Sequence, residues 1–352
     1  MLVCYHRSSS IGTLSFCEQK YFLTYNLGMK DKQNLKATMG TVVHKCMETL
    51  GNVLIAKREG KRKVKDEIFN HTFKELEDLE FISQMCYDYY SKHVPELSAK
   101  FTPKIYKQCH EWFLKALAFR DGEMDPRNQD IFAVEQYFDI TIDKPWSKYR
   151  YEVDGEVIEG NLSIKGTVDV IVKHDEKYFQ ILDYKTGKRL DWASGEVKTQ
   201  AKLEKDVQLL LYYYALKNTF PDYEFYVSIY YINDSKIDGV DVKGGLFDIC
   251  FDESDYAKAE EILKQKFEYI KSVQQPKLLS QEHRSFKCKY LCAFIEEYKD
   301  TGKTICHHIQ DEVKKKGINQ VVAEYGKGLD HINSYGSGGG VLSDEDKASD
   351  ST

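Results

Sequence analysis

Residues 162–185 read LSIKGTVDVIVKHDEKYFQILDYK, and this stretch decides the fold that we expect. Its first half alternates apolar residues with others, and its second half is an apolar run that ends in Asp183-Tyr184-Lys185. The short polar turn at 174–176 between the halves predicts an antiparallel hairpin. Because side chains alternate across a strand, Asp183 and Lys185 share one face. Pairing of the two strands would bring Asp169 to them.

Strand and helix patterns flank the hairpin on both sides. β-branched and aromatic residues indicate further strands at 131–142, 225–232 and 246–251. Apolar residues at helical spacing indicate helices from Ser8 onward, from near Gly40, and at 203–218 and 255–273. We therefore predict an α/β fold with a central mixed β-sheet flanked by helices.

The region before the first long strand has a different character. From 66 to 120 the sequence is polar with helical spacing, which predicts a helical insertion or subdomain at about 57–128 within a domain of residues 1–330. The end of the chain, 334–352, is small, polar and acidic. That composition predicts a disordered tail.

The composition restricts the class of protein. The chain has 352 residues, 42% of them hydrophobic, and a net charge of −6. An overall basic footprint is absent, which counts against a protein that coats nucleic acid but allows an enzyme with a local basic groove. The sequence has neither a secretory signal nor an apolar run long enough to cross a bilayer, so we expect a cytoplasmic protein without membrane contact.

The charged end of the second hairpin strand is the candidate catalytic feature. The bare pattern of an acid, any residue and a lysine is unspecific, since it recurs at 18–20, 175–177 and 297–299, where a surface charge pair explains it. The pair Asp183 and Lys185 differs because it closes an apolar strand, where charges are unfavourable unless they are used or paired. Two carboxylates suit a hard divalent cation, and a lysine beside it can stabilise a phosphodiester transition state.

Several motifs in order carry a family resemblance. They are G-T-V-D at 166–169, I-L-D-Y-K-T-G at 181–187 and Q-x-x-x-Y from Gln208 to Tyr212. Together they resemble the PD-(D/E)XK nuclease superfamily, in the branch of the RecB and AddB nuclease domains and the CRISPR-adaptation exonucleases. The segment from Gly40 to His44 resembles the upstream G-x-x-x-H helix of that branch.

The resemblance implies a restriction-endonuclease-like core, and it implies roles for individual residues. Asp169 and Asp183 would bind Mg²⁺ or Mn²⁺, with His44 and the carbonyl of Tyr184 as third and fourth ligands. Lys185 would be catalytic, and Gln208 would orient the lysine or the DNA. Glu135 matches a frequent acidic position of the family, although a surface acid at a strand edge explains it equally well.

Four cysteines extend the resemblance to a cofactor. In this branch one N-terminal and three C-terminal cysteines can bind a [4Fe–4S] cluster, and the matching residues here are Cys17, Cys288, Cys292 and Cys306. The C-terminal spacing is wider than usual for the family. His307 and His308 could therefore complete a structural Zn²⁺ site instead, and thiols without a metal are the third alternative.

We therefore expect a metal-dependent DNA nuclease. The family suggests an exonuclease that acts on DNA ends or single strands in recombination, repair or phage DNA processing. A structure-specific endonuclease and a non-catalytic DNA-binding subunit of a helicase–nuclease assembly are the alternatives. No phosphate-binding loop of the G-x-x-x-x-G-K-[ST] type is present in the sequence, so any motor would be a separate partner, such as a helicase or a recombinase.

Overall fold

The central sheet of the protein is mixed and six-stranded. The computed structural model describes residues 1–31, 34–65, 68, 70–191, 194–279, 287–327 and 332. Strands β1, β7, β8, β9 and β12 follow one another across the sheet, and β4 pairs with β7. Strands β1 and β7 run parallel, as do β8 and β9, whereas the other pairs are antiparallel. The predicted α/β fold with a central mixed sheet is confirmed.

The elements have the following bounds. The sheet strands are β1 Tyr5–His6, β4 Ile131–Thr141, β7 Ser163–Lys173, β8 Tyr178–Lys185, β9 Glu224–Tyr231 and β12 Gly245–Cys250. Three ribbons are formed by β2 Lys63–Lys65 with β3 Asn70–Thr72, β5 Lys148–Val153 with β6 Glu156–Asn161, and β10 Ser235–Ile237 with β11 Val240–Val242. The helices are α1 Ser8–Phe16, α2 Glu18–Tyr21, α3 Leu35–Arg58, α4 Leu79–His93, α5 Pro103–Leu117, α6 Gln200–Leu203, α7 Val207–Thr219, α8 Glu253–Ser272, α10 Lys289–Leu291, α11 Ile305–Lys316 and α12 Ile318–Tyr325.

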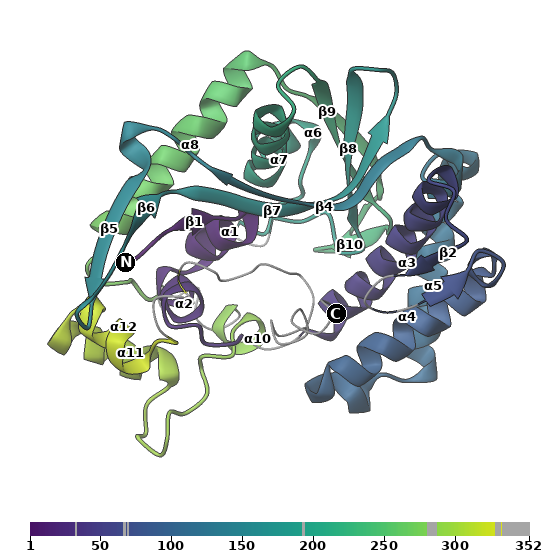
Figure 1. Cartoon of the computed structure of the whole chain (residues 1–352). Helices are drawn as coiled ribbons and strands as arrows, with labels where there is room; N and C mark the ends of the chain where they lie inside the picture. The colour runs from purple at the N-terminus through teal and green to yellow at the C-terminus, as the bar shows by residue number, and fades with distance from the viewer. Residues whose placement is uncertain are drawn as a thin grey trace, which may run out of the picture.

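Two layers of helices enclose the sheet (Figure 1). Helix α7 packs on β4, β7 and β9, and α8 packs on α7. Helix α3 packs on β4 and β7, and α4 and α5 pack on α3, forming the lobe on the right of Figure 1. The apolar residues form two cores, one around α7 and one between α3 and the sheet. The end of the β7–β8 hairpin therefore lies between helices from both layers.

The predicted hairpin is present. Strands β7 and β8 are antiparallel, with Val170 opposite Leu182 and Val172 opposite Gln180. The turn between them is held by Asp175, whose carboxylate accepts the backbone N–H groups of Lys177 and Tyr178. An aspartate that binds the backbone two or three residues later is a common way to close a turn.

The segment 57–128 is only partly helical. It contains α4 and α5 as expected, but also the ribbon of β2 and β3, which the helical pattern did not predict. Both helices share a core with α3, so this segment packs on the sheet through α3. Its division from the rest of the chain stays a prediction, and the predicted tail 334–352 lies outside the described residues.

Two expected helices are interrupted. The first breaks at Cys17, whose extended backbone separates α1 from α2. The helix expected at 203–218 begins only at Val207, because Leu203 ends the short helix α6 and Asp206 leaves the helical conformation and caps α7 by accepting the N–H of Gln208. The hairpin of β5 and β6 was missed, although its turn, Asp154-Gly155, is a strong hairpin signal with positive φ at both residues. None of the helices that the structure describes is long and apolar enough to cross a bilayer.

Candidate active site

Three acids line up across neighbouring strands of the sheet. On β4 and β7, Val134 pairs with Val170 and Gln136 pairs with Val168, so Glu135 is opposite Asp169. The β7–β8 register places Asp183 opposite Asp169 one position beyond the last paired residues. The two ladders thus bring Glu135, Asp169 and Asp183 to one end of the hairpin.

The hairpin strands separate at these acids, and Asp169 replaces the missing backbone partner. Its Oδ2 accepts the backbone N–H of Tyr184 at 2.8 Å. Asp169 therefore contacts the backbone amide of Tyr184. The carbonyl of Tyr184, which the family resemblance implies as a metal ligand, is a different group of the same residue. A buried N–H without a partner would be unfavourable, so this bond fixes the Asp169 carboxylate where the strands diverge.

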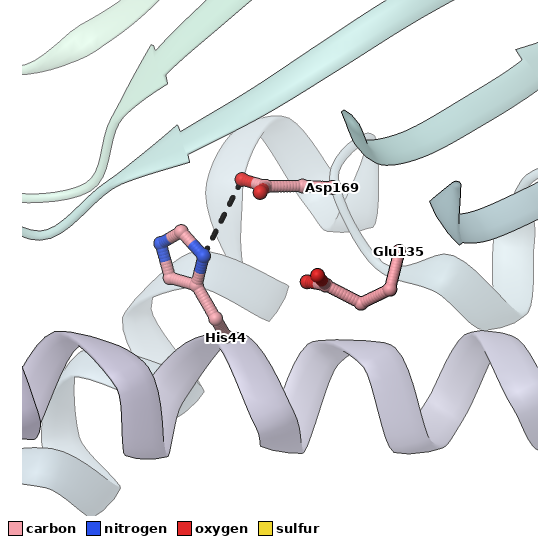
Figure 2. A group of neighbouring side chains, drawn as sticks. All are labelled: His44, Glu135 and Asp169. Atoms are coloured by element: carbon pink, nitrogen blue, oxygen red, sulfur yellow. Dashed lines mark ion pairs between the residues drawn. The ribbon is translucent and has the colours of Figure 1, made fainter. Parts of the chain in front are cut away.

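His44 joins the acids from α3 (Figure 2). Its Nδ1 lies 3.4 Å from Oδ2 of Asp169. One ligand atom each from His44, Glu135 and Asp169 lie within 4.8 Å of one another. Two carboxylates and an imidazole are suitable ligands for Mn²⁺, and Mg²⁺ would bind mainly to the carboxylate oxygens. This set of ligand atoms therefore fits the Mg²⁺ or Mn²⁺ ion expected from the family resemblance.

Glycines on α3 allow this approach. A Cβ at Gly40 would lie 2.7 Å from Oγ1 of Thr186, and one at Gly51 would lie 2.5 Å from Cγ1 of Val134. Gly40 is one helical turn before His44, on the same side of α3. The missing side chains let α3 sit close to β4 and to the end of β8, so the short imidazole can reach Asp169.

Asp183 belongs to a second group, on the α7 side of the centre. Its Oδ2 lies 2.6 Å from Nζ of Lys185. Its Oδ1 accepts hydrogen bonds from Nε2 of Gln208 at 3.1 Å and from the hydroxyl of Tyr212 at 3.4 Å. Gln208 and Tyr212 are also joined to each other, at 2.6 Å. Three bonding partners, Lys185, Gln208 and Tyr212, thus fix the orientation of the Asp183 carboxylate.

His44 and Asp169 each shift the pKa of the other. Burial alone would lower the pKa of His44, but the charge of Asp169 and its hydrogen bond raise it to about 9. Burial would likewise raise the pKa of Asp169, but the charge of His44 lowers it below its usual value. In the absence of a metal ion, the pair is therefore an imidazolium with a carboxylate at neutral pH.

Burial and neighbouring negative charges raise the pKa values of Glu135 and Asp183. Burial, together with the charges of Asp169 and Glu48, raises the pKa of Glu135 to about 8, although its side chain still reaches solvent. Burial also raises the pKa of Asp183, against the opposing effect of Lys185. Carboxylates that resist ionisation beside one another are typical of a site that a cation would relieve.

The backbone of Glu135 is strained. Its φ is 45°, in the left-handed region that glutamate rarely adopts. Such a conformation costs about 1–3 kcal/mol and is common at functional sites. It interrupts the β4–β7 ladder at this residue, which turns the carboxylate toward Asp169 and His44 (Figure 2).

The sequence missed other charged residues near the centre. Glu48 follows His44 by one turn on α3, accepts a salt bridge from Lys45 at 2.8 Å, and lies close enough to affect Glu135. Its i+4 spacing from His44 was the available signal. Asp206, which positions Gln208, was also missed, because a helix cap inside a longer helical pattern gives no clear signal.

The four cysteines line one cavity, which also includes residues of α1 and α2. The cavity has a volume of about 210 Å³, and Cys17, Cys288, Cys292 and Cys306 all contribute to its wall. His307 lines it as well, whereas His308 stacks on Tyr298 with ring centroids 4.3 Å apart. The two chain ends thus meet here, although 289 residues separate Cys17 from Cys306.

Comparison with known proteins assigns the family. The sequence model of the PD-(D/E)XK nuclease superfamily matches residues 8–296. The chain belongs to this superfamily, whose nucleases use divalent metal ions, and the predicted restriction-endonuclease-like fold is confirmed. No curated protein matches the sequence. Among solved structures, a Eubacterium rectale protein described as a "putative exonuclease" is similar at 14% identity and a TM-score of 0.42, over 81% of this chain and 86% of that one.

Proposed function

We propose that this protein is a deoxyribonuclease that hydrolyses phosphodiester bonds at the centre formed by His44, Glu135, Asp169, Asp183 and Lys185. The observation that carries the proposal is that three side chains able to bind a metal ion offer ligand atoms within 4.8 Å of one another, beside a buried aspartate paired with a lysine. A surface cluster of charges would not combine a histidine, a strained glutamate and a carboxylate that replaces a ladder bond.

Each residue has a part in the proposed reaction. A divalent ion held by His44, Glu135 and Asp169 would polarise the phosphate and activate the attacking water. Asp183 is also predicted to be a ligand, and Gln208 holds its carboxylate in place. Lys185, whose side chain is 32% exposed, would stabilise the negative charge that develops on the phosphate.

The shape of the surface near Gln208 favours a strand of nucleic acid as substrate. A groove of about 1140 Å³ lies between α1 and the segment 190–208, larger than the roughly 300–1,000 Å³ of a small-molecule site. Gln208 lines the groove, and so do Phe16 and Lys20, which also line the cysteine cavity. A strand lying in this groove would extend from the catalytic centre toward the cysteines. This arrangement, with the family resemblance, favours an exonuclease acting on DNA ends or single strands.

For the cysteine cavity we propose a [4Fe–4S] cluster. The four thiols line one cavity, but among the described residues no three of these sulfurs lie within 4.8 Å of one another. A single zinc ion with Zn–S bonds of about 2.3 Å would need its thiolates closer than that, whereas a four-iron cluster holds its thiolates farther apart.

The test of the function is cleavage of labelled linear DNA with Mg²⁺ or Mn²⁺. Lys185→Ala should lower the cleavage rate by about 10²–10³, because one charge-stabilising donor is lost. Lys177→Ala, which removes an exposed lysine just before the same strand, is the matched control and should cleave normally. Full metal-dependent activity of Lys185→Ala would contradict the proposed mechanism.

Covalently closed single-stranded circles separate the two enzymatic alternatives. An exonuclease needs an end, so linear strands should be degraded while circles persist. Rapid cutting of circles would instead identify a structure-specific endonuclease. A wild-type protein that binds DNA with no cleavage in either metal would indicate a non-catalytic subunit that works beside a helicase or a recombinase.

A further inference from the structure

A second pair of a lysine and a carboxylate lies next to the proposed catalytic centre. Nζ of Lys198 pairs with the carboxylate of Asp206, and their side chains are only 24% and 13% exposed. Asp206 also caps α7 by accepting the backbone N–H of Gln208 at 2.9 Å. The side chain of Gln208 in turn donates to Oδ1 of Asp183 at 3.1 Å. The second pair is therefore joined to the catalytic centre through the first turn of α7.

Asp206 also lies close to the catalytic lysine. Burial alone would lower the pKa of Lys185, but the negative charges of neighbouring carboxylates, Asp206 included, raise it. Tyr231, the residue opposite Lys185 in the β8–β9 pairing, has its pKa raised by burial and by the charges of Asp206 and Asp183. Lys185 nevertheless pairs with Asp183, at 2.6 Å, while Asp206 pairs with Lys198. Four neighbouring charges are thus sorted into two separate pairs.

The position of Lys198 is fixed by the chain that follows β8. This chain turns back on itself, with an antiparallel bridge between Leu190 and Val197. The N–H of Lys198 donates to the carbonyl of Arg189 at 3.2 Å, and the guanidinium of Arg189 donates to the carbonyl of Lys198 at 3.0 Å. These two bonds hold the backbone of Lys198 in the place from which its side chain reaches Asp206.

Without Lys198, the carboxylate of Asp206 would need another partner. A largely buried carboxylate that has lost its cation is unfavourable. Its charge already acts on Lys185, so that ammonium group would be shared between Asp206 and Asp183. Asp206 would then turn away from the N–H of Gln208 and loosen the start of α7.

We propose that Lys198 is a positioning residue of the catalytic centre. By pairing with Asp206, it keeps that carboxylate from drawing Lys185 away from Asp183. The same pair fixes the start of α7, from which Gln208 reaches Asp183. The effect on cleavage rests on the proposed nuclease function, whereas the effect on α7 does not depend on it.

The first test measures kcat and KM separately on linear DNA. Lys198→Met should lower kcat by about tenfold to 10²-fold, because a small displacement of a catalytic group is costly, and should change KM by less than about threefold. Asp206→Asn should lower kcat by at most about fivefold, since asparagine also caps a helix and carries no charge that attracts Lys185. The double variant should recover most of the kcat that Lys198→Met alone has lost.

Lys217→Met is the matched control for these variants. Lys217 is 13% exposed and pairs with Glu224 at 2.9 Å, at the other end of α7. This variant should cleave as wild type. A double variant as slow as Lys198→Met would overturn the proposal, because removal of the Asp206 charge restores neither a lost tether nor a lost DNA contact. A higher KM with unchanged kcat in Lys198→Met would identify a DNA contact and would overturn it as well.

The second test is hydrogen exchange of the protein without metal and without DNA. In Lys198→Met the amides in the first turn of α7, Gln208 among them, should exchange at least about fivefold faster, because the cap is weakened. The double variant should return to the wild-type rate, and Lys217→Met should not change it. Unchanged exchange in Lys198→Met would contradict the proposal. The expected exchange pattern in a protein that cleaves no DNA with either metal would contradict the nuclease function alone.

Discussion

The proposed catalytic centre and the cysteine cavity are assembled in different ways. At the catalytic centre, Asp169, Asp183 and Lys185 come from one hairpin, and strand register aligns them with Glu135. At the cavity, Cys17 meets three cysteines from the far end of the chain. The first is built on sheet hydrogen bonds, whereas the second depends on contacts between the chain ends, such as the bond from Gln19 to the carbonyl of Cys306 at 3.3 Å.

Because of this difference, we expect the hairpin centre to determine cleavage and the cysteine cavity to determine the stability of the fold. The hairpin keeps its geometry through backbone pairing, so its acids can be charged, buried and mutually repulsive without unfolding the sheet. The cavity has fewer backbone constraints, and a cofactor bound there would hold the two ends of the chain together. Variants at the catalytic centre should therefore affect cleavage, and variants at the cavity should affect folding.

The largest expected effect is that of Asp169→Asn. The loss of a metal-binding charge should lower the cleavage rate by about 10³, since several kcal/mol of transition-state stabilisation depend on the ion. Thermal unfolding should change little, because asparagine can still accept the Tyr184 amide bond. Asp241→Asn, at an exposed site on β11, is the control. A large fall in the melting temperature would mean that this centre is a structural site as well.

Next in size is the pH dependence of metal binding. The pKa of His44 is raised to about 9 and that of Glu135 to about 8, so both hold protons at neutral pH when no metal is bound. Ligands must lose these protons, so Mn²⁺ affinity should rise by at least about tenfold per pH unit between pH 7 and 8 and level off above pH 9. Calorimetry on the DNA-free protein measures this.

Variants assign the two protons. Glu135→Gln should make the dependence below pH 8 shallower, because only the proton of His44 is then released, and His44→Ala should remove the dependence between pH 8 and 9. If the Mn²⁺ affinity of the wild-type protein stayed constant from pH 7 to 9, the protons on His44 and Glu135 would not compete with the metal ion, and the prediction would be wrong.

A smaller effect on cleavage is expected at the cavity, from Cys292→Ser. The variant should lose iron, and its melting temperature should fall by at least about 5 °C, because the binding energy of a cofactor adds to that of folding. Folded variant should still cleave DNA at a rate within about tenfold of wild type. Cys250→Ser, an exposed cysteine outside the cavity, is the control. Retained iron with an unchanged melting temperature would contradict the cluster.

The smallest effect is expected from Gly40→Ala. The added methyl would meet Oγ1 of Thr186 at 2.7 Å and push α3 away from the acids, with a cost of about 1–3 kcal/mol for overpacking. Metal affinity should fall several-fold, and the double variant Gly40→Ala with Thr186→Ala should regain most of it. Gly12→Ala is the control in a helix with no atom within 4 Å. No recovery in the double variant would mean that helix propensity or flexibility, not this contact, is responsible.

Local patterns were sufficient to predict much of the fold. Alternation and the polar turn gave the β7–β8 hairpin, because a strand pattern and a turn act over a few residues. The same reasoning did not predict where two of the helices are interrupted. The breaks at Cys17 and Asp206 depend on where each helix must end to pack and to place its cap, which a helical period does not reveal.

The sequence by itself determined which chemistry is available: acids and a lysine on adjacent strands, a histidine on a preceding helix, and cysteines at both ends. Only the tertiary structure decided how these groups are arranged. It placed Asp183 with Lys185 and Gln208 rather than with His44, and it gave Glu135 its left-handed backbone. The reason is physical: charge and hydrogen bonding depend on distances between segments, and packing sets those distances only once the chain has folded.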